Sequence, residues 1–264
     1  MRDEQKFRFR LGLALMCAVS LLALVSLIYT PHDPYAMDSA RRFLPPSLQH
    51  LFGTDQFGRD NFSRAVTGTR YSLFVAVSTV ALSGTIGVSI GLFIGYAGGA
   101  AEAIVMRLTD ALASFPGILM ALVAVTVCGG GKYTIIPALA VAFLPSYIRI
   151  ARSGAQQCAR REFIEAARTC GVSTGRILFR HILPNLLPSV VPALVIGLSN
   201  AILAESGMSY LGLGIQPPTP SWGRMLAEGQ VFLLKAPWES ISAGLMIFVT
   251  VLGFHNFGDG LSQK

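Results

Sequence analysis

Apolar runs long enough to cross a lipid bilayer constrain this chain more than any other feature. A helix needs about 20 apolar residues to span a hydrocarbon core of about 30 Å. Neither segment 71–96 nor segment 11–29 contains a charged residue. Six runs are predicted membrane spans: Leu11–Tyr29, Tyr71–Tyr96, Ile104–Cys128, Tyr133–Ile148, Leu186–Ala204 and Ser240–Phe254. We therefore expect an all-α, polytopic membrane protein with six transmembrane helices.

The composition excludes ordinary soluble proteins and disordered chains. Hydrophobic residues make up 52% of the chain and charged residues 13%, whereas a soluble domain carries about 25% charged residues. Disordered chains are polar and highly charged. The net charge of +7 would suit nucleic acid if it formed one patch, but eleven of the 21 Lys and Arg lie in segments 1–10 and 149–181. We expect lipid around the chain and no nucleic-acid partner.

The same two basic segments predict the orientation in the membrane, because Lys and Arg are enriched in cytoplasmic loops. With six spans they fall on one side, so both termini are expected in the cytoplasm. The five Arg of the external segment 30–70 argue against this orientation. The first span could instead be a cleaved signal peptide, but its 19-residue run exceeds the apolar region of about 7–15 residues in such signals. We expect an uncleaved anchor.

The segment between the fourth and fifth spans predicts two short helices that form a knob, residues 162–182. Apolar residues recur at helical spacing from Phe163 to Cys170, and Gly171 is placed to end that helix. A second helix, Thr174–Ile182, is expected to end before Pro184. Ala166 and Ala167 allow close approach of another backbone, while Glu165 and Arg168 offer charge-assisted bonds. The knob therefore suits docking to a cytoplasmic partner; the alternative is a basic loop that only sets topology.

Small and charged residues inside the spans give two further expectations. Gly84, Gly87, Gly91 and Gly95 form a smooth stripe on the second span, which predicts close helix packing within the chain or, alternatively, against a partner. Arg107 and Asp110 lie three residues apart on the third span, so we expect them to pair, the alternative being a substrate contact.

No cofactor or metal site is expected in this chain. The four histidines lie in separate segments or, near the sixth span, match no metal motif, and the cysteine spacing matches no zinc site. The run ending in Lys132 and Tyr133 lacks the first glycine and the Ser or Thr of a phosphate-binding loop. We therefore expect no ATP hydrolysis, and no enzyme activity, from the chain itself.

The knob and three other segments carry a resemblance to a known family. The sequence Glu165-Ala166-Ala167-Arg168, then Gly171 and Leu183-Pro184, is similar to the "EAA" signature of ABC-importer permeases. The segments 53–64, 209–223 and 257–261 resemble the C-type permease subunit of dipeptide, oligopeptide and nickel importers. His181 departs from the general signature and fits this branch. The resemblance spans about residue 50 to the end and implies a type I ABC importer permease of the bacterial inner membrane.

That resemblance implies a division of labour among several subunits. A second permease subunit would share the pathway for peptides or nickel and metal chelates. Two cytoplasmic ATPase subunits, which bind ATP and Mg, would dock on residues 165–171, and an external solute-binding protein would deliver the substrate. Residues 1–70 would form a tail, first span and external loop, and residues 71–264 a five-helix core with a coupling loop at about 149–185. The alternatives are an ion-coupled secondary transporter or channel, or a membrane scaffold protein.

Overall fold

The chain folds into helices joined mostly by short connections, with a longer loop over residues 26–60, in a computed structural model that describes residues 2–129 and 133–262. Residues 130–132, in the glycine-rich segment considered for phosphate binding, lie outside the described residues. The α-helices are α1 (Arg2–Val25), α2 (Asn61–Ala97), α3 (Gly99–Ala113), α4 (Gly117–Cys128), α5 (Ile135–Ala159), α6 (Glu162–Thr169), α7 (Thr174–Arg176), α8 (Leu183–Tyr210), α9 (Trp222–Gly229) and α10 (Pro237–Ser262). Two 3-10 helices, η1 (Ser39–Arg41) and η3 (Gln230–Phe232), and a π-helix, η2 (Ile177–Ile182), complete the described elements.

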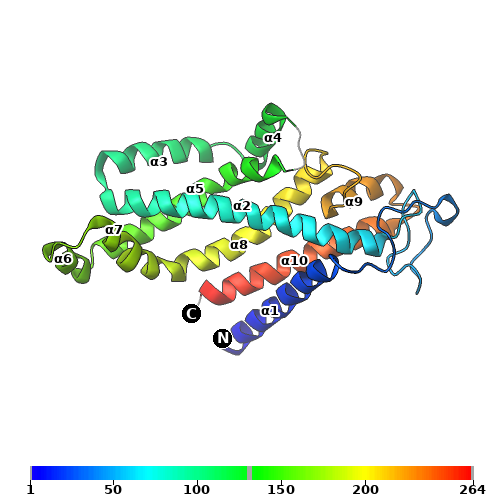
Figure 1. Cartoon of the computed structure of the whole chain (residues 1–264), viewed down its shortest axis with the longest axis horizontal. Helices are drawn as coiled ribbons and strands as arrows, with labels where there is room; N and C mark the ends of the chain where they lie inside the picture. The colour runs from blue at the N-terminus through cyan, green and yellow to red at the C-terminus, as the bar shows by residue number, and fades with distance from the viewer. Residues whose placement is uncertain (1, 130–132, 263–264) are drawn as a thin grey trace.

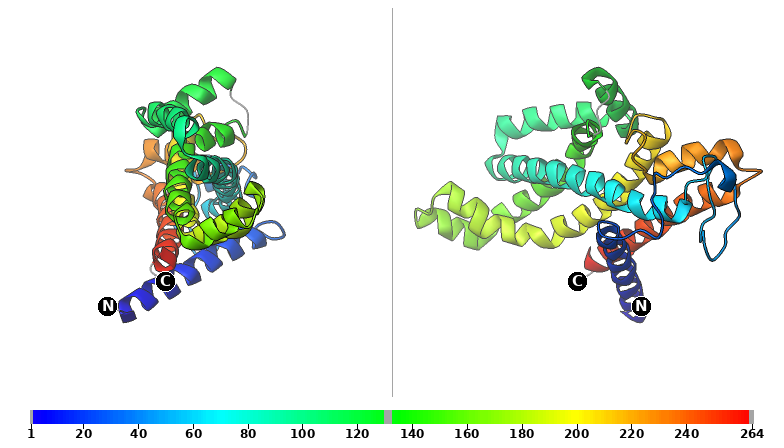
Figure 2. Two further views of the ribbon diagram at one scale, coloured as in Figure 1. Left: turned by 90° about the vertical axis from the view of Figure 1, so that its left-hand side faces the viewer. Right: turned by 45° about the vertical axis from the view of Figure 1, so that its right-hand side comes forward.

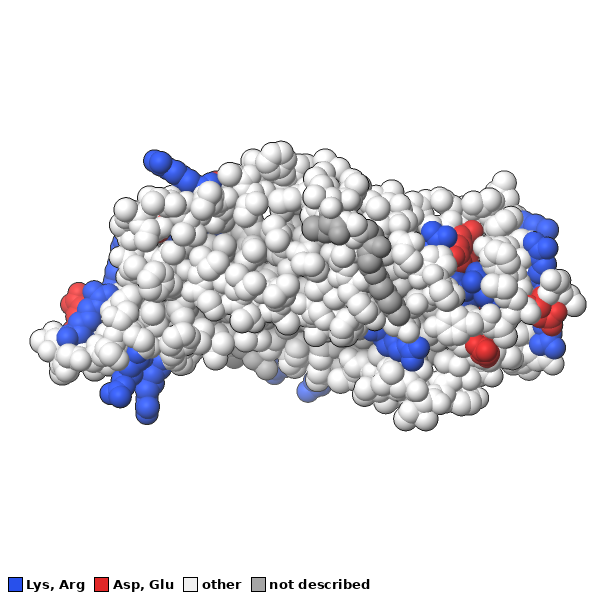
Figure 3. Space-filling view, turned by 45° about the horizontal axis from the view of Figure 1, so that its top comes forward, with Lys and Arg blue, Asp and Glu red and all other residues white. Residues whose placement is uncertain are grey.

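Helices cover most of each of the six predicted membrane spans. Among the described residues, five helical segments are long and apolar enough to cross a membrane, and the bent pair α3–α4 gives a sixth if it is one span. Lys, Arg, Asp and Glu gather mostly at the two ends of the molecule, and the face between them is largely uncharged (Figure 3). Because a bilayer core excludes charge, this distribution confirms the prediction of an all-α, polytopic membrane protein.

The third span differs from the single helix predicted over Ile104–Cys128. It is broken into α3 and α4, which meet at 88°. The break falls at Pro116, whose ring disfavours helical backbone in the preceding residue and which has no N–H to donate. The third predicted span is therefore present as a bent pair of helices instead of one continuous helix.

The fourth span is longer than predicted. The sequence suggests an end at Ile148, where charged residues begin, but α5 continues to Ala159. Arg149 and Arg152 are paired with acidic residues of the neighbouring helix α3, so their charge does not end the helix. The first residues of the predicted loop 149–185 thus belong to α5.

The glycine stripe of α2 packs against α5 and α8. A Cβ atom on Gly91 would lie 2.4 Å from the carbonyl oxygen of Ile148, and one on Gly95 would lie 2.5 Å from that of Arg152. Gly87 faces the same helix, and Gly84 faces Leu194 of α8. The stripe therefore lets two backbones meet inside this chain, which confirms the first of the two predicted packing modes.

The remaining long helices complete the bundle. A buried apolar cluster that includes Val80, Tyr147, Ile202 and Phe254 joins α2, α5, α8 and α10. Helix α1 runs beside α10 at the edge of the molecule (Figures 1 and 2). Its Gly12 lies against the backbone of α10. The knob lies at one end of the bundle and the loop before α2 lies at the other (Figure 1).

Candidate functional site

The first helix of the knob, α6, is anchored by one side chain. Ile164 is fully buried in a cluster with Ile177, Leu178 and Ile182 of η2. Glu165, Ala166 and Arg168 on the same helix are exposed. The helix therefore turns its apolar face to the start of α8 and its predicted docking residues outward, at the far end of the molecule (Figure 1).

Gly171 ends α6 as predicted. Its φ of +72° lies in the left-handed region that glycine adopts without strain. The N–H of Gly171 donates to the carbonyl of Arg168 and that of Val172 to the carbonyl of Ala167, both at 3.0 Å. These bonds satisfy carbonyls that the helix end leaves free and fix the turn into the next helix.

The second helix of the knob does not end before Pro184, contrary to prediction. Helix begins at Thr174 and continues through η2 and α8 to Tyr210. In η2 the turns widen, and Leu183 N–H donates to the carbonyl of Leu178, five residues earlier. Leu183 and Pro184 follow these widened turns directly, so Pro184 lies inside a continuous helix although it has no N–H to donate. The knob is thus continuous with a membrane span.

Arg168 joins the knob to the end of α2. Its Nε donates to the Tyr96 hydroxyl at 3.1 Å, and its guanidinium lies 4.6 Å from the centre of the Tyr96 ring. Tyr96 follows Gly95 of the packed stripe. The knob is therefore joined to α8 through the chain and to α2 through a hydrogen bond and a cation–π contact.

The predicted pairing of Arg107 with Asp110 is wrong. Asp110 of α3 pairs with Arg149 of α5, whose Nη2 lies 2.8 Å from Oδ1. A second bridge joins Glu102 to Gln156 at 2.6 Å and to Arg152. Because α3 lies along α5, an arginine of the neighbouring helix reaches the carboxylate in place of one on the same helix. These two bridges tie α3 to α5.

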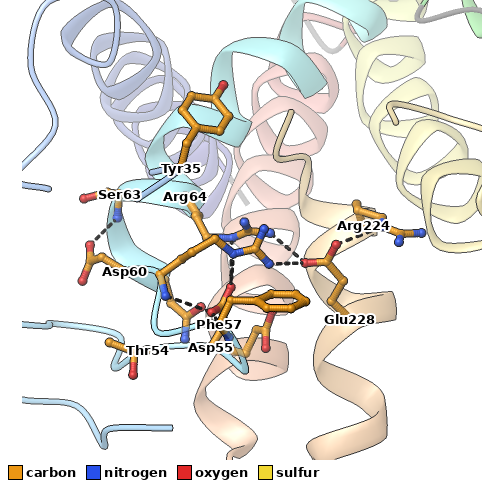
Figure 4. A network of polar contacts seen from close by, with 12 residues as sticks. Tyr35, Thr54, Asp55, Phe57, Asp60, Ser63, Arg64, Arg224 and Glu228 are labelled. Atoms are coloured by element: carbon orange, nitrogen blue, oxygen red, sulfur yellow. Dashed lines mark hydrogen bonds and ion pairs between the residues drawn. The ribbon is translucent and has the colours of Figure 1, made fainter. Parts of the chain in front are cut away.

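A buried polar network, absent from the sequence predictions, lies at the end opposite the knob (Figure 4). Arg59 Nε lies 2.5 Å from Asp55, and its Nη2 lies 3.0 Å from Glu228 of α9. Arg64 of α2 reaches the same Glu228 oxygen at 2.8 Å, and Arg224 reaches the other at 3.0 Å. All but Arg224 are nearly or fully buried. The i,i+4 spacings of Asp55 with Arg59 and of Arg224 with Glu228 are the local signals of this network.

Trp222 lies at the same end. Its place in a segment rich in proline and glycine predicts an anchor at a membrane interface, but it is fully buried, and its Nε1 donates to the carbonyl of Ala65 at 3.0 Å. Ser221 caps α9 by accepting from Arg224 N–H. The segment before it is held to α8, because Ser209 Oγ accepts from Ile215 N–H at 3.2 Å. The loop is a packed element of the fold.

The chain matches the family described as "Binding-protein-dependent transport system inner membrane component" over residues 87–263. It is 36% identical over 247 residues to the probable D,D-dipeptide transport system permease protein DdpC of Escherichia coli (strain K12), covering 92% of this chain and 83% of that protein. It is 37% identical over 250 residues to the dipeptide transport system permease protein DppC of Alkalihalophilus pseudofirmus, covering 95% and 82%. It is 41% identical over 216 residues to the glutathione transport system permease protein GsiD of Pectobacterium atrosepticum, covering 82% and 72%.

The chain therefore belongs to the family of binding-protein-dependent inner-membrane transport components. It is a multi-pass permease subunit of an ABC importer of the peptide family. The family assignment supports this reading over an ion-coupled secondary transporter or channel.

Proposed function

We propose that this chain forms half of a translocation pathway for small peptides and is driven by two ATPase subunits that dock on the knob. A second permease subunit would supply the other half, and an external solute-binding protein would deliver the peptide. The relatives' names support peptides over nickel or metal chelates, because they refer to dipeptides and glutathione. ATP and Mg would be bound by the ATPase partners, so ATP hydrolysis would take place on those subunits and not on this chain.

The anchoring of α6 supports the docking role. Ile164 is fully buried, while Glu165, Ala166 and Arg168 are exposed and Ala167 lies between these faces. A force on that surface passes to α8 through the helix that begins at Thr174. Such a connection suits a protein whose pathway opens and closes with nucleotide hydrolysis in a partner.

In this arrangement the knob and both termini lie in the cytoplasm. Cys170 is exposed beside Gly171, and Cys158 is buried. In vesicles that carry this chain without its ATPase partners, a membrane-impermeant maleimide should therefore label Cys170 when the vesicles are inside-out and leave it unlabelled when they are right-side-out. Labelling from the outside alone would reverse the proposed orientation. A Cys170→Ser variant identifies the labelled position.

A charge reversal at Glu165 tests the docking role. In proteoliposomes with the complete importer, Glu165→Lys should abolish peptide uptake and substrate-stimulated ATP hydrolysis, because the docking surface loses its acidic group. The matched control is Glu4→Lys, the same reversal on an exposed residue of α1, which should retain both activities. Normal stimulated hydrolysis by an assembled Glu165→Lys complex would overturn the proposal.

The partners and the substrate need their own measurement. Purification of the tagged chain from membranes should recover a second permease and two ATPase subunits. The purified chain alone should hydrolyse no ATP. Cells that carry the importer should take up a labelled dipeptide, and excess unlabelled dipeptide should compete while free nickel should not. Competition by nickel alone would favour the metal-chelate alternative.

A further inference from the structure

Two histidines and one buried aspartate converge at the start of α2, on the end of the molecule opposite the knob. His50 Nδ1 lies 2.8 Å from Asp60 Oδ1, and His32 Nδ1 lies 3.7 Å from Asp60 Oδ2. The two imidazole rings are 4.7 Å apart between centroids. We propose that His32, His50 and Asp60 bind one zinc ion.

The spacing of the three side chains fits a tetrahedral ion. Zinc binds imidazole nitrogen and carboxylate oxygen at about 2.0–2.2 Å, which places neighbouring ligand atoms about 3.3 Å apart. The two nitrogen–oxygen distances, 2.8 and 3.7 Å, lie on either side of that value. One ligand atom from each residue falls within 4.8 Å of the other two. Small rotations of the rings therefore suffice to seat an ion.

The charge at this position also calls for a cation. Asp60 is 3% exposed, and a buried carboxylate is costly without a positive partner. Among the ion pairs of the described residues, Asp60 faces the two histidines and neither a lysine nor an arginine. A second acidic cluster nearby does not call for a cation, because Arg59 and Arg64 already place positive charge beside it. Its members are Asp55, Glu228 and Glu239. The positive end of α2, which Asp60 caps, balances part of the Asp60 charge, and a zinc ion would add a full cation.

Hydrogen bonds hold the ligand residues in place, and one ligand atom has no hydrogen-bond partner among the described residues. His32 Nδ1 is buried without a hydrogen-bond partner among the described residues. Asp60 Oδ2 accepts from Ser63 N–H at 2.8 Å, and Ser63 Oγ accepts from His32 N–H at 3.1 Å. Such bonds orient a ligand set. The His32 side chain is 37% exposed although its Nδ1 is buried, so the site lies just below the surface.

The choice of ion follows from the ligands. Two imidazoles and one carboxylate suit zinc, whereas magnesium and calcium prefer oxygen ligands alone. The ion would tie the segment that follows α1 to the first turn of α2, so its role would be to fix this end of the fold. Sequence spacing does not reveal the site, because residues 32 and 50 belong to separate turns.

Zinc binding by the full chain, purified within its complex on a tag without histidine, tests the proposal. After chelation and dialysis, titration calorimetry with zinc chloride should give one site per chain. His32→Ala should weaken zinc binding at least tenfold. The matched control is His255→Ala, which removes a histidine that faces Asp259 at 3.5 Å on the cytoplasmic half of α10 in our proposed orientation, and it should bind zinc as the unaltered chain does.

The experiment must distinguish a variant that loses the zinc site from a variant that fails to fold. His50→Ala removes a hydrogen bond to Asp60 and could unfold the loop, whereas the His32 ring makes no hydrogen bond at Nδ1. His32→Ala should therefore keep the elution profile of the unaltered chain while losing zinc. Cobalt in place of zinc should give a visible absorption band in the unaltered chain and none in His32→Ala. Equal zinc binding by His32→Ala and the unaltered chain, or none by either, would overturn the proposal.

Discussion

Arg64 of α2 and Glu228 of α9 form a 2.8 Å ion pair although 164 residues separate them in the sequence. Arg64 is 1% exposed and Glu228 12%. The same carboxylate receives Arg59 from the preceding loop. One acidic side chain thus holds together the loop before α2, the start of α2 and the helix after the fifth span.

Removal of this carboxylate should destabilise the protein strongly. Glu228→Ala leaves the Arg59 and Arg64 guanidinium groups buried with one acidic partner fewer, and breaking a buried pair costs about 3–5 kcal/mol. We expect the melting temperature of the purified chain to fall by about 10 °C. Arg41→Ala is the control, because the Arg41–Asp38 pair is half exposed and contributes about 0–1 kcal/mol. Equal melting temperatures for the two variants would show that the network is not structural.

Gly91 should not tolerate even a methyl group. A Cβ there would lie 2.4 Å from the Ile148 carbonyl oxygen and 2.8 Å from Ala151 Cβ, so α2 and α5 would have to separate, at a cost of about 1–3 kcal/mol. Gly91→Ala should lower the amount of folded permease extracted from membranes. Gly244→Ala in α10 meets no atom within 4 Å and should be extracted like the unaltered chain. Similar yields of both variants would argue against tight packing of this stripe.

Gly171 should be required for coupling because of its backbone conformation, not because space around it is limited. Nothing lies within 4 Å of an added Cβ, but the φ of +72° disfavours any other side chain by about 1–2 kcal/mol. Gly171→Ala should therefore reorient α6 and reduce substrate-stimulated ATP hydrolysis about five- to thirtyfold, with normal membrane insertion. Gly175→Ala is matched to it, since Gly175 is equally open and lies in α7 without a positive φ. Loss of coupling in Gly175→Ala as well would assign the effect to the surface instead of the turn.

The sequence predicts those features that depend on local pattern. Apolar runs give the six spans, and Gly171 marks the end of α6 because glycine adopts a positive φ without strain. The face of α6 that holds Ile164 follows from helical spacing. Family resemblance adds the interpretation of residues 165–171, which one sequence read physically does not distinguish from a basic loop.

The sequence does not predict features that depend on contacts between residues far apart in the chain. The end of α5 depends on Arg149 and Arg152 meeting acidic residues of α3, and no periodicity reports that pairing. Trp222 is buried because its nitrogen reaches Ala65, 157 residues away. His32 and His50 meet only because two turns fold onto the start of α2. In each case the partner is set by tertiary packing.

Substitutions at Asp110 and Arg149 test whether this charged pair between two apolar helices is structural or contacts the substrate. Their side chains are 63% and 48% exposed in this chain, and an unpaired charge inside a membrane costs about 2.5–3.5 kcal/mol.

Asp110→Arg alone should lower the membrane level of the permease and its uptake, because it places two arginines together. The swap Asp110→Arg with Arg149→Asp should restore both, since the pair reforms with its charges exchanged. Arg107→Ala should change neither, because Arg107 is not the partner of Asp110. Restored membrane level without restored uptake in the swapped variant would instead mean that the charges themselves contact the transported molecule.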